Sequence, residues 1–266
     1  MGRISKTFSE LEKQKKKALI AYIVAGDPDL SCTLKSMHLM VSEGVNIIEL
    51  GVAFSDPMAE GPSIQRGHER ALIEKTSLED ILKLVMCFRE TNKNTPVVLM
   101  GYMNPFRAMG CKIFSCEASQ SGVDGLLIVD MPPEESNEFT KETRKLGIDI
   151  IRLVAPTTKE SRIKTICSEA SGYVYYISLK GTTGANSIDI KELEKKVSVV
   201  KSLTNLPVVI GFGIKDGKTV TSLRNLADGI VVGSTLVDIM GGQKDRIEKD
   251  LSIKIKDLSR SLNEDK

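Results

Sequence analysis

The chain has 266 residues, with 37 basic and 35 acidic side chains, and its net charge of +2 gives no reason to expect nucleic acid or a membrane as a partner. It has no apolar run long enough for a transmembrane helix, and its N-terminus lacks the apolar core of a secretory signal, so we expect a cytoplasmic protein. Five cysteines without a CxxC pair and only two histidines argue against a zinc site, a disulfide framework or a Ser-His or Cys-His nucleophile. Any acid–base chemistry must then come from carboxylates and tyrosines.

Short apolar runs alternate with longer amphipathic segments along the chain. The runs, which we expect to be strands, cover residues 19–25, 47–52, 96–102, 125–131, 149–155, 173–179, 207–214 and 229–232. Helical patterns lie between them, as at 78–90, 133–146, 162–170, 190–203 and 218–226. An extra helix is expected at 5–17, before the first strand, and a last helix after Gly242. Eight such units in about 250 residues predict a single (β/α)8 TIM barrel domain over 1–266, with an open doubly wound sheet as the alternative.

The second expected strand carries one carboxylate among apolar residues. Because side chains alternate along a strand, Ile48 and Leu50 share one face, while Glu49 shares the other with Ile47 and Gly51. The first face suits packing against helices, and the second suits the interior of a barrel near its mouth. A buried carboxyl group usually has a raised pKa. Glu49 is therefore either a general acid or one half of a structural ion pair with a neighbouring strand.

The loops that follow the strands carry the chemistry in a barrel of this kind. In the turn after the first strand, Asp27 is expected to cap the next helix. The loop at 180–187 is almost free of apolar side chains, which predicts a mobile lid, with a plain connector as the alternative. Glycines at 211–213 and at Gly233 end the last two strands and predict a phosphate site, unless they only relieve crowding at the rim.

With these loops located, the chain resembles the alpha-subunit family of tryptophan synthase from Phe8 to about Val237. The matching motifs, in order, are AGDP at 25–28, IELG at 48–51, FSDP at 54–57, GP at 61–62, IQ at 64–65, LMGYMNP at 99–105, VDG at 123–125, PPEE at 132–135, APTT at 155–158, TG at 183–184, GFGI at 211–214 and VGS at 232–234. Each is weak alone, but together, in this order and spacing, they are highly specific.

The resemblance implies a barrel that cleaves indole-3-glycerol phosphate to indole and glyceraldehyde 3-phosphate, a retro-aldol cleavage without a metal or a cofactor of its own. Glu49 matches the catalytic glutamate of the family, which favours its acid–base role over the ion pair. The second catalytic carboxylate, an aspartate in the family, matches Glu60, whose side chain is one methylene longer. Ala53 stands where the family usually has proline, and we hypothesise a looser loop that absorbs the longer side chain.

Other positions are carried over one by one from the resemblance. Those that match the substrate pocket are Tyr22, where the family commonly has phenylalanine, and Met100, Tyr102, Leu127, Val129, Leu153 and Tyr175, together with Thr183 in the lid. Ordinary barrel core is the alternative role for the apolar ones. Those that match the phosphate site are Gly184, Phe212, Gly213, Gly233 and Ser234. His68 lies near the active loop and is expected to be a surface residue.

The family works with a pyridoxal-phosphate beta subunit in an αββα complex and passes indole through a tunnel. The resemblance therefore places the cofactor on the partner and implies contact loops at 53–60, 104–106 and 132–135, with Asp56 as a polar contact. Two other functions stay open. One is a weakly catalytic or non-catalytic regulatory subunit that binds the phosphate ligand and activates a beta partner; the other is a different phosphate-binding barrel enzyme, such as an isomerase, against which the 49–65 stretch argues.

Overall fold

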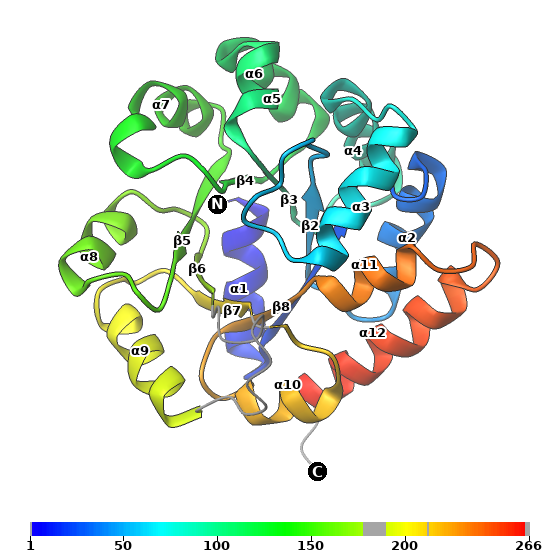
Figure 1. Ribbon diagram of the computed structural model, residues 1–266. Helices are drawn as coiled ribbons and strands as arrows, with labels where there is room; N and C mark the ends of the chain where they lie inside the picture. Colours follow the sequence, from blue (N-terminus) through cyan, green and yellow to red (C-terminus); the bar gives the residue numbers. More distant parts are fainter. Residues whose placement is uncertain (1, 178–189, 212, 264–266) are drawn as a thin grey trace.

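The computed structural model describes residues 2–177, 190–211 and 213–263. Eight parallel strands close into a barrel in which each strand pairs with the next along the chain and β8 pairs with β1 (Figure 1). The strands are β1 Ala18–Val24, β2 Ile47–Gly51, β3 Val97–Gly101, β4 Gly125–Ile128, β5 Asp149–Val154, β6 Val174–Ile177, β7 Val208–Gly211 and β8 Gly229–Val232. The predicted (β/α)8 barrel is confirmed, and the open sheet is excluded. Most strands end before the predicted runs do, because residues at the barrel mouth leave the ladder and turn into loops.

Helices form a ring around the strands (Figure 1). They are α2 Leu30–Ser42, α3 Pro62–Ile73, α4 Leu78–Thr91, α5 Met103–Met109, α6 Cys111–Ser121, α7 Asn137–Lys145, α8 Glu160–Ser168, α9 Ile190–Ser202, α10 Gly217–Leu223, α11 Ser234–Met240 and α12 Ile247–Asn263. The helix predicted at 133–146 is divided into a 3-10 turn, η1 Pro133–Glu135, and α7. The division falls at Ser136, whose hydroxyl donates to the Pro133 carbonyl at 2.8 Å. No described helix is both long enough and apolar enough to cross a membrane.

The predicted N-terminal helix is present as α1 Arg3–Lys13. Ile4, Phe8 and Leu11 recur at helical spacing, and all three are buried. They join the cluster of side chains inside the barrel, and the Phe8 ring lies 5.9 Å from that of Tyr173. The helix ends before residue 17, the predicted limit, and Lys15 has a φ of 56°, which is not helical. Helix α1 therefore packs against one end of the barrel interior.

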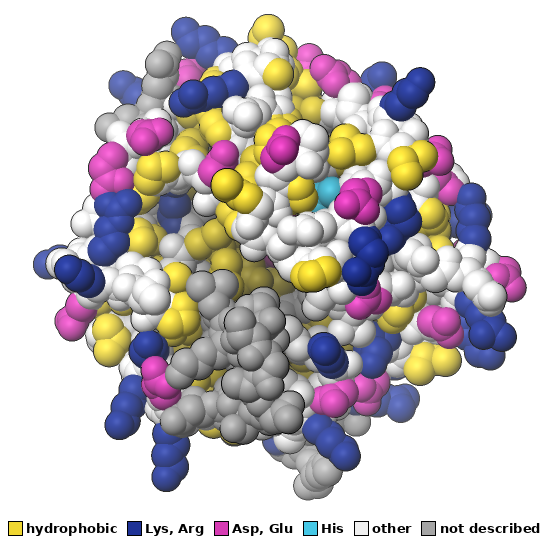
Figure 2. Space-filling view, in the orientation of Figure 1, with side chains coloured by type: hydrophobic (Ala, Val, Ile, Leu, Met, Phe, Trp, Pro, Cys, Tyr) yellow, Lys and Arg dark blue, Asp and Glu magenta, His cyan; other side chains and the backbone are white. Residues whose placement is uncertain are grey.

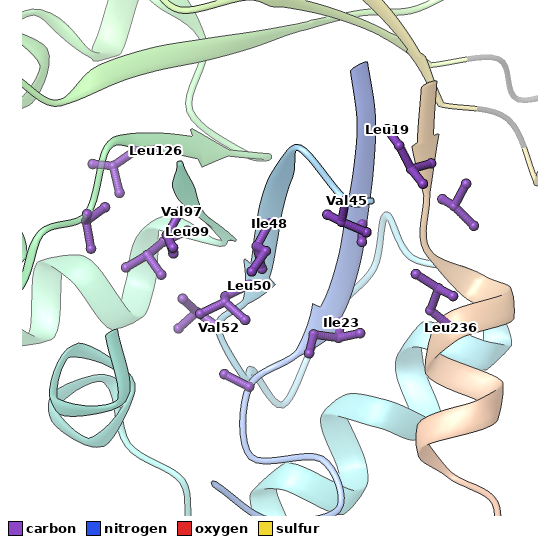
Figure 3. Packing of buried hydrophobic residues seen from close by; sticks show 14 of the residues in the cluster. Leu19, Ile23, Val45, Ile48, Leu50, Val52, Val97, Leu99, Leu126 and Leu236 are labelled. Carbon is purple, nitrogen blue, oxygen red and sulfur yellow. The ribbon is translucent and has the colours of Figure 1, made fainter. Parts of the chain in front are cut away.

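The two faces of β2 pack as the alternation predicts. Ile48, Leu50 and Val52 belong to the outer cluster between strands and helices, and Figure 3 shows them near Val97 and Leu99. The opposite face carries Ile47, which belongs to the inner cluster. Burial of each such aliphatic side chain contributes about 1.5–3 kcal/mol. This burial fixes the register of β2, since a slip of one residue would move Glu49 into the apolar outer layer.

The prediction for Asp27 is wrong, because the residue that caps α2 is Asp29. Its Oδ1 accepts from the backbone N–H of Cys32 at 2.8 Å, and its backbone is extended directly before the first helical residue. Asp27 lies two residues too early for that role and is fully buried. It accepts two hydrogen bonds, at 2.6 and 2.7 Å, from the guanidinium of Arg70 on α3.

Candidate active site

Glu49 lies on the inner face of β2, where Tyr22 of β1 and Val98 of β3 are its partners in register. Its side chain is fully buried. The hydroxyl of Tyr173 donates to Glu49 Oε1 at 2.5 Å, whereas Oε2 has no hydrogen-bond partner among the described residues. An unpartnered buried oxygen is uncommon and costs stability, which makes this carboxyl group a candidate for function rather than structure.

Burial raises the pKa of Glu49 to about 7, against the lowering effect of the Tyr173 hydrogen bond, and the charge of Glu60 raises it further. A carboxyl group with such a pKa is present in both protonation states near neutral pH. It can therefore donate a proton in one step and accept one in another.

Glu60 comes from the loop between β2 and α3 and is half-buried. Desolvation raises its pKa to about 7. Its backbone is held on both sides, because its N–H donates to the Pro57 carbonyl at 3.0 Å and its carbonyl accepts from the Gln65 side chain at 2.9 Å. The charge of Glu60 raises the pKa of Glu49, so the two carboxyl groups lie close enough to interact at the barrel mouth.

Tyr102 anchors the same loop from the end of β3. Its hydroxyl accepts from the backbone N–H of Ala59 at 3.0 Å, and its ring stacks on Phe54 with the centroids 5.2 Å apart. This predicted pocket residue therefore contacts the segment that carries Glu60. The other predicted pocket residues meet inside the barrel, where Met100 and Leu127 are buried and Val129, Leu153 and Tyr175 pack against the inner cluster.

Two glycines make room for two tyrosine hydroxyls in this interior. A Cβ added at Gly51 would lie 2.3 Å from Tyr22 Oη, and one added at Gly211 would lie 1.9 Å from Tyr175 Oη. Both distances are too short for non-bonded atoms, so neither position admits a side chain without a shift of the ring. The absence of a side chain at Gly51 and Gly211 thus leaves room for the two tyrosine hydroxyls in the barrel interior.

At the predicted phosphate site, Gly213 and Gly233 follow β7 and β8 as expected, and Ser234 is the first residue of α11. No atom of the described residues lies within 4 Å of the point where a Cβ of Gly213 would stand, and the two loops are joined by a hydrogen bond of 3.2 Å from Thr235 Oγ1 to the Ile214 carbonyl. Phe212, Thr183 and Gly184, with the rest of the predicted lid at 180–187, lie outside the described residues. The described part of the chain has no group of three His, Cys, Asp or Glu side chains that could hold a metal ion.

The prediction that His68 lies on the surface is wrong, since its side chain is only 1% exposed. Helix α3 turns the face with Gly67, His68 and Ala71 toward the barrel. The ring Nδ1 accepts from the backbone N–H of Phe54 at 3.1 Å, and Nε2 lies 3.4 Å from Tyr22 Oη. Burial lowers the pKa of His68 to about 4, so the ring is neutral at neutral pH.

Two residues of this site escaped the sequence analysis. The sequence pattern places Tyr173 only in a strand, whereas the fold brings its hydroxyl against Glu49. His68 is expected on the surface, but Ala71 follows it by three residues, and this helical spacing places both side chains on the packed side of α3.

Comparison with known proteins gives one consistent result. The sequence matches the family described as tryptophan synthase alpha chain over residues 8–264. It is 50% identical over 238 residues to the tryptophan synthase alpha chain of Nitrosomonas europaea, covering 90% of this chain and 86% of that one. The corresponding protein of Methylococcus capsulatus is 46% identical over 249 residues, covering 94% and 93%.

Solved structures agree with the sequence matches. Tryptophan synthase subunit alpha from Legionella pneumophila superposes with a TM-score of 0.92 at 37% identity, covering 98% of each chain. A chain of the tryptophan synthase complex from Pyrococcus furiosus gives a TM-score of 0.82 at 38% identity, covering 91% of this chain and 98% of that one.

Proposed function

The chain belongs to the tryptophan synthase alpha chain family, whose members cleave indole-3-glycerol phosphate, and we propose that Glu49 and Glu60 are the two carboxyl groups that carry out this cleavage here. The observation that carries the proposal is the fully buried Glu49 carboxyl group inside the barrel, with a pKa of about 7 and with no partner for Oε2 among the described residues. The enzyme is a carbon–carbon lyase in tryptophan biosynthesis.

The chemistry needs two proton transfers. C3 of the indole ring gains a proton so that the ring can leave, and the hydroxyl on the adjacent side-chain carbon loses one as the C–C bond breaks and the aldehyde forms. Glu49 suits both transfers, because its pKa of about 7 makes both protonation states available and because Tyr173 orients its carboxyl group. In its ionised form, Glu60 accepts the indole N–H and so stabilises the positive charge that develops on the ring.

The pocket residues divide between the two ends of the substrate. In this proposal the indole ring lies among Tyr22, Met100, Leu127, Val129 and Tyr175, with Tyr102 beside the Glu60 loop and Thr183 in the lid. The phosphate lies at the ends of β7 and β8, and its ligands are Gly184, Phe212, Gly213, Gly233 and Ser234. Support comes from Gly233, where an added Cβ would lie 3.3 Å from the Tyr22 ring, so the two subsites adjoin.

We also propose that the chain assembles with a tryptophan synthase beta subunit as an αββα tetramer in the cytoplasm, with pyridoxal phosphate bound only by the partner. The proposed contact loops are 53–60, which includes Asp56, 104–106 and 132–135. Met58 in the first of these is 85% exposed, which is unusual for a large apolar side chain. Figure 2 shows further hydrophobic side chains on this face, with many of the Lys and Arg side chains toward its edge.

Steady-state release of indole from indole-3-glycerol phosphate, measured with and without a cognate beta subunit, tests the function. Turnover that rises when beta is added supports the lyase and its partner together. Tight binding of the phosphate ligand and activation of beta without any turnover would instead favour the regulatory subunit, which the family membership does not favour.

The Glu60→Asp variant is expected to change kcat/KM by less than about tenfold. The backbone contacts that hold the loop, from Glu60 to Pro57 and Gln65, do not involve its side chain and persist in the variant. Glu60→Gln is the matched control, since it keeps the length but not the charge, and its kcat should fall about 100-fold or more. A large rise in the activity of Glu60→Asp would show that the longer acid is poorly placed.

A further inference from the structure

His68 makes two hydrogen bonds that together fix its tautomer. The backbone N–H of Phe54 can only donate, so the Nδ1 atom that it meets at 3.1 Å carries no proton. The ring is neutral because burial lowers its pKa, and its single proton must then be on Nε2. This N–H points to Tyr22 Oη, 3.4 Å away.

The hydroxyl of Tyr22 is therefore an acceptor toward His68 and must donate its own proton elsewhere. Tyr22 is only 3% exposed, and on the side of β2 its oxygen packs over Gly51, where no side chain fits. Besides His68 on α3, the titratable groups that act on this hydroxyl come from β2, the loop after it, the end of β3 and β6; they are Glu49, Glu60, Tyr102 and Tyr175.

Of these groups, only the two carboxyl groups are pure hydrogen-bond acceptors when ionised, and among the described residues neither forms a hydrogen bond with Tyr22 in this structure. Glu49 is the register partner of Tyr22, and within the part of the chain that the structure describes its Oε2 has no hydrogen-bond partner. We propose that His68 is a positioning residue that holds the Tyr22 hydroxyl as a hydrogen-bond donor toward the carboxyl pair of Glu49 and Glu60. The inference rests on the proposed function, and it adds the Tyr22 hydroxyl to the site as a hydrogen-bond donor to the two carboxyl groups.

A hydroxyl that donates to a carboxylate stabilises its ionised form, so the apparent pKa of the pair falls. Cleavage needs one ionised carboxylate as base, so this pKa sets the acidic limb of the profile of kcat/KM against pH. Loss of the donor raises the pKa and moves the limb to higher pH. The Tyr22→Phe variant is expected to raise the apparent pKa by about 0.5 to 1 and to lower kcat/KM below pH 7 by about three- to tenfold.

Two variants of His68 separate positioning of Tyr22 from support of the loop. Gln places an amide N–H where Nε2 stood and can still reach Tyr22, whereas Asn keeps only an acceptor near the Nδ1 position, for Phe54. We expect His68→Gln to keep the wild-type acidic limb and His68→Asn to shift it as Tyr22→Phe does. In the double variant, Tyr22→Phe with His68→Asn, the shift should be no larger than with Tyr22→Phe alone.

The proposal is overturned if His68→Asn keeps the wild-type limb, or if the shifts of the two single variants add in the double variant. Either result would mean that His68 only supports the Phe54 backbone or acts independently of Tyr22. Thermal unfolding of each variant confirms that it is folded at the temperature of the assay.

Nitrogen NMR of histidine-labelled protein tests the tautomer without any assay of activity. The chain has only His38 and His68, so one His38→Gln sample assigns both rings. We expect His68 to show the Nε2–H tautomer and to remain neutral down to about pH 5. A proton on Nδ1 would overturn the proposal even in an active enzyme, whereas an inactive wild type with the Nε2–H form would refute only the proposed function.

Discussion

Glu49→Gln is expected to lower kcat for indole release by a factor of about 10²–10⁴, the usual contribution of a general acid or base. Glutamine matches the size of glutamate and can still accept the hydroxyl of Tyr173 at its amide oxygen, so the barrel interior keeps its packing. It can neither release nor take up a proton. The loss should therefore fall on kcat, with KM changed little.

The control is Glu90→Gln, which makes the same chemical change on the exposed surface of α4 and should leave kcat unaltered. Release of indole by both variants and wild type is compared at several substrate concentrations. If Glu49→Gln kept kcat within about threefold of wild type, Glu49 would not be the proton carrier. That result would not support a structural ion pair at Glu49 instead, because no cation contacts Glu49 among its described hydrogen bonds.

The same variant should be more stable than wild type at alkaline pH. In the folded protein the pKa of Glu49 is about 7, against an ordinary value of 4.5, so folding favours the protonated form. As pH rises from 4.5 through 7, the unfolded chain ionises first and wild type loses stability, by about 1–3 kcal/mol above pH 7. Glutamine does not titrate. Urea denaturation at pH 4.5 and pH 8 should show a gap between the proteins only at pH 8, and an equal gap at both would contradict the raised pKa.

The position of Glu49 could be predicted because it depends on a local pattern. Alternation along β2 separates Ile48 and Leu50 from Glu49, and burial of the aliphatic face then decides which side turns inward. The glycines that end β7 and β8 are likewise visible in the sequence. Strand period and turn chemistry were therefore enough to find the barrel, its mouth and one acid.

The positions of other side chains could not be found in the same way. Tyr173 is 124 residues from Glu49 along the chain, and only closure of the barrel brings the two together. His68 belongs to a helix whose rotation is set by packing against the barrel rather than by its own pattern of charges. Asp27 and Asp29 are two positions apart in the sequence, and which of them caps α2 depends on the residue at which the helix begins.

The second large effect is expected at the opposite end of the barrel, where Asp124→Ala should destabilise the protein by about 3–5 kcal/mol. Asp124 precedes β4 and is 7% exposed. Its Oδ2 accepts from the Arg89 guanidinium at 2.7 Å and from the Val97 N–H at 2.8 Å, and its Oδ1 accepts from Arg3 at 2.8 Å. Alanine removes all three acceptor contacts at once.

The size of the effect comes from Arg89, which is 6% exposed. Burial lowers its pKa to about 10, so it still carries a full charge at neutral pH. After the substitution this charge keeps only neutral acceptors, such as the carbonyls of Gly122 at 3.0 Å and Thr95 at 2.7 Å. A buried cation without its counterion is among the costliest single defects in a folded protein.

The barrel supplies a matched control in Asp228, which precedes β8 as Asp124 precedes β4. It accepts from the N–H of Val208 at 2.9 Å, as Asp124 does from Val97. Its ion-pair partners are Lys201 at 2.9 Å, where both side chains are 35% exposed, and Lys17 at 3.8 Å, whose side chain is 31% exposed. Because both lysines are partly exposed and can return to water, Asp228→Ala should cost only about 1 kcal/mol.

Urea denaturation of the two alanine variants measures the difference. Equal losses would mean that the bond to the strand N–H, common to both sites, carries the whole effect and that the buried charge carries none. A second change separates the lost N–H bond from the unpaired charge. Arg89→Met in the Asp124→Ala background removes the unpaired cation and should restore about half or more of the lost stability. If the double variant were less stable than Asp124→Ala, the arginine would act mainly through its carbonyl contacts, and the ion pair would not be what fixes β4 against α4.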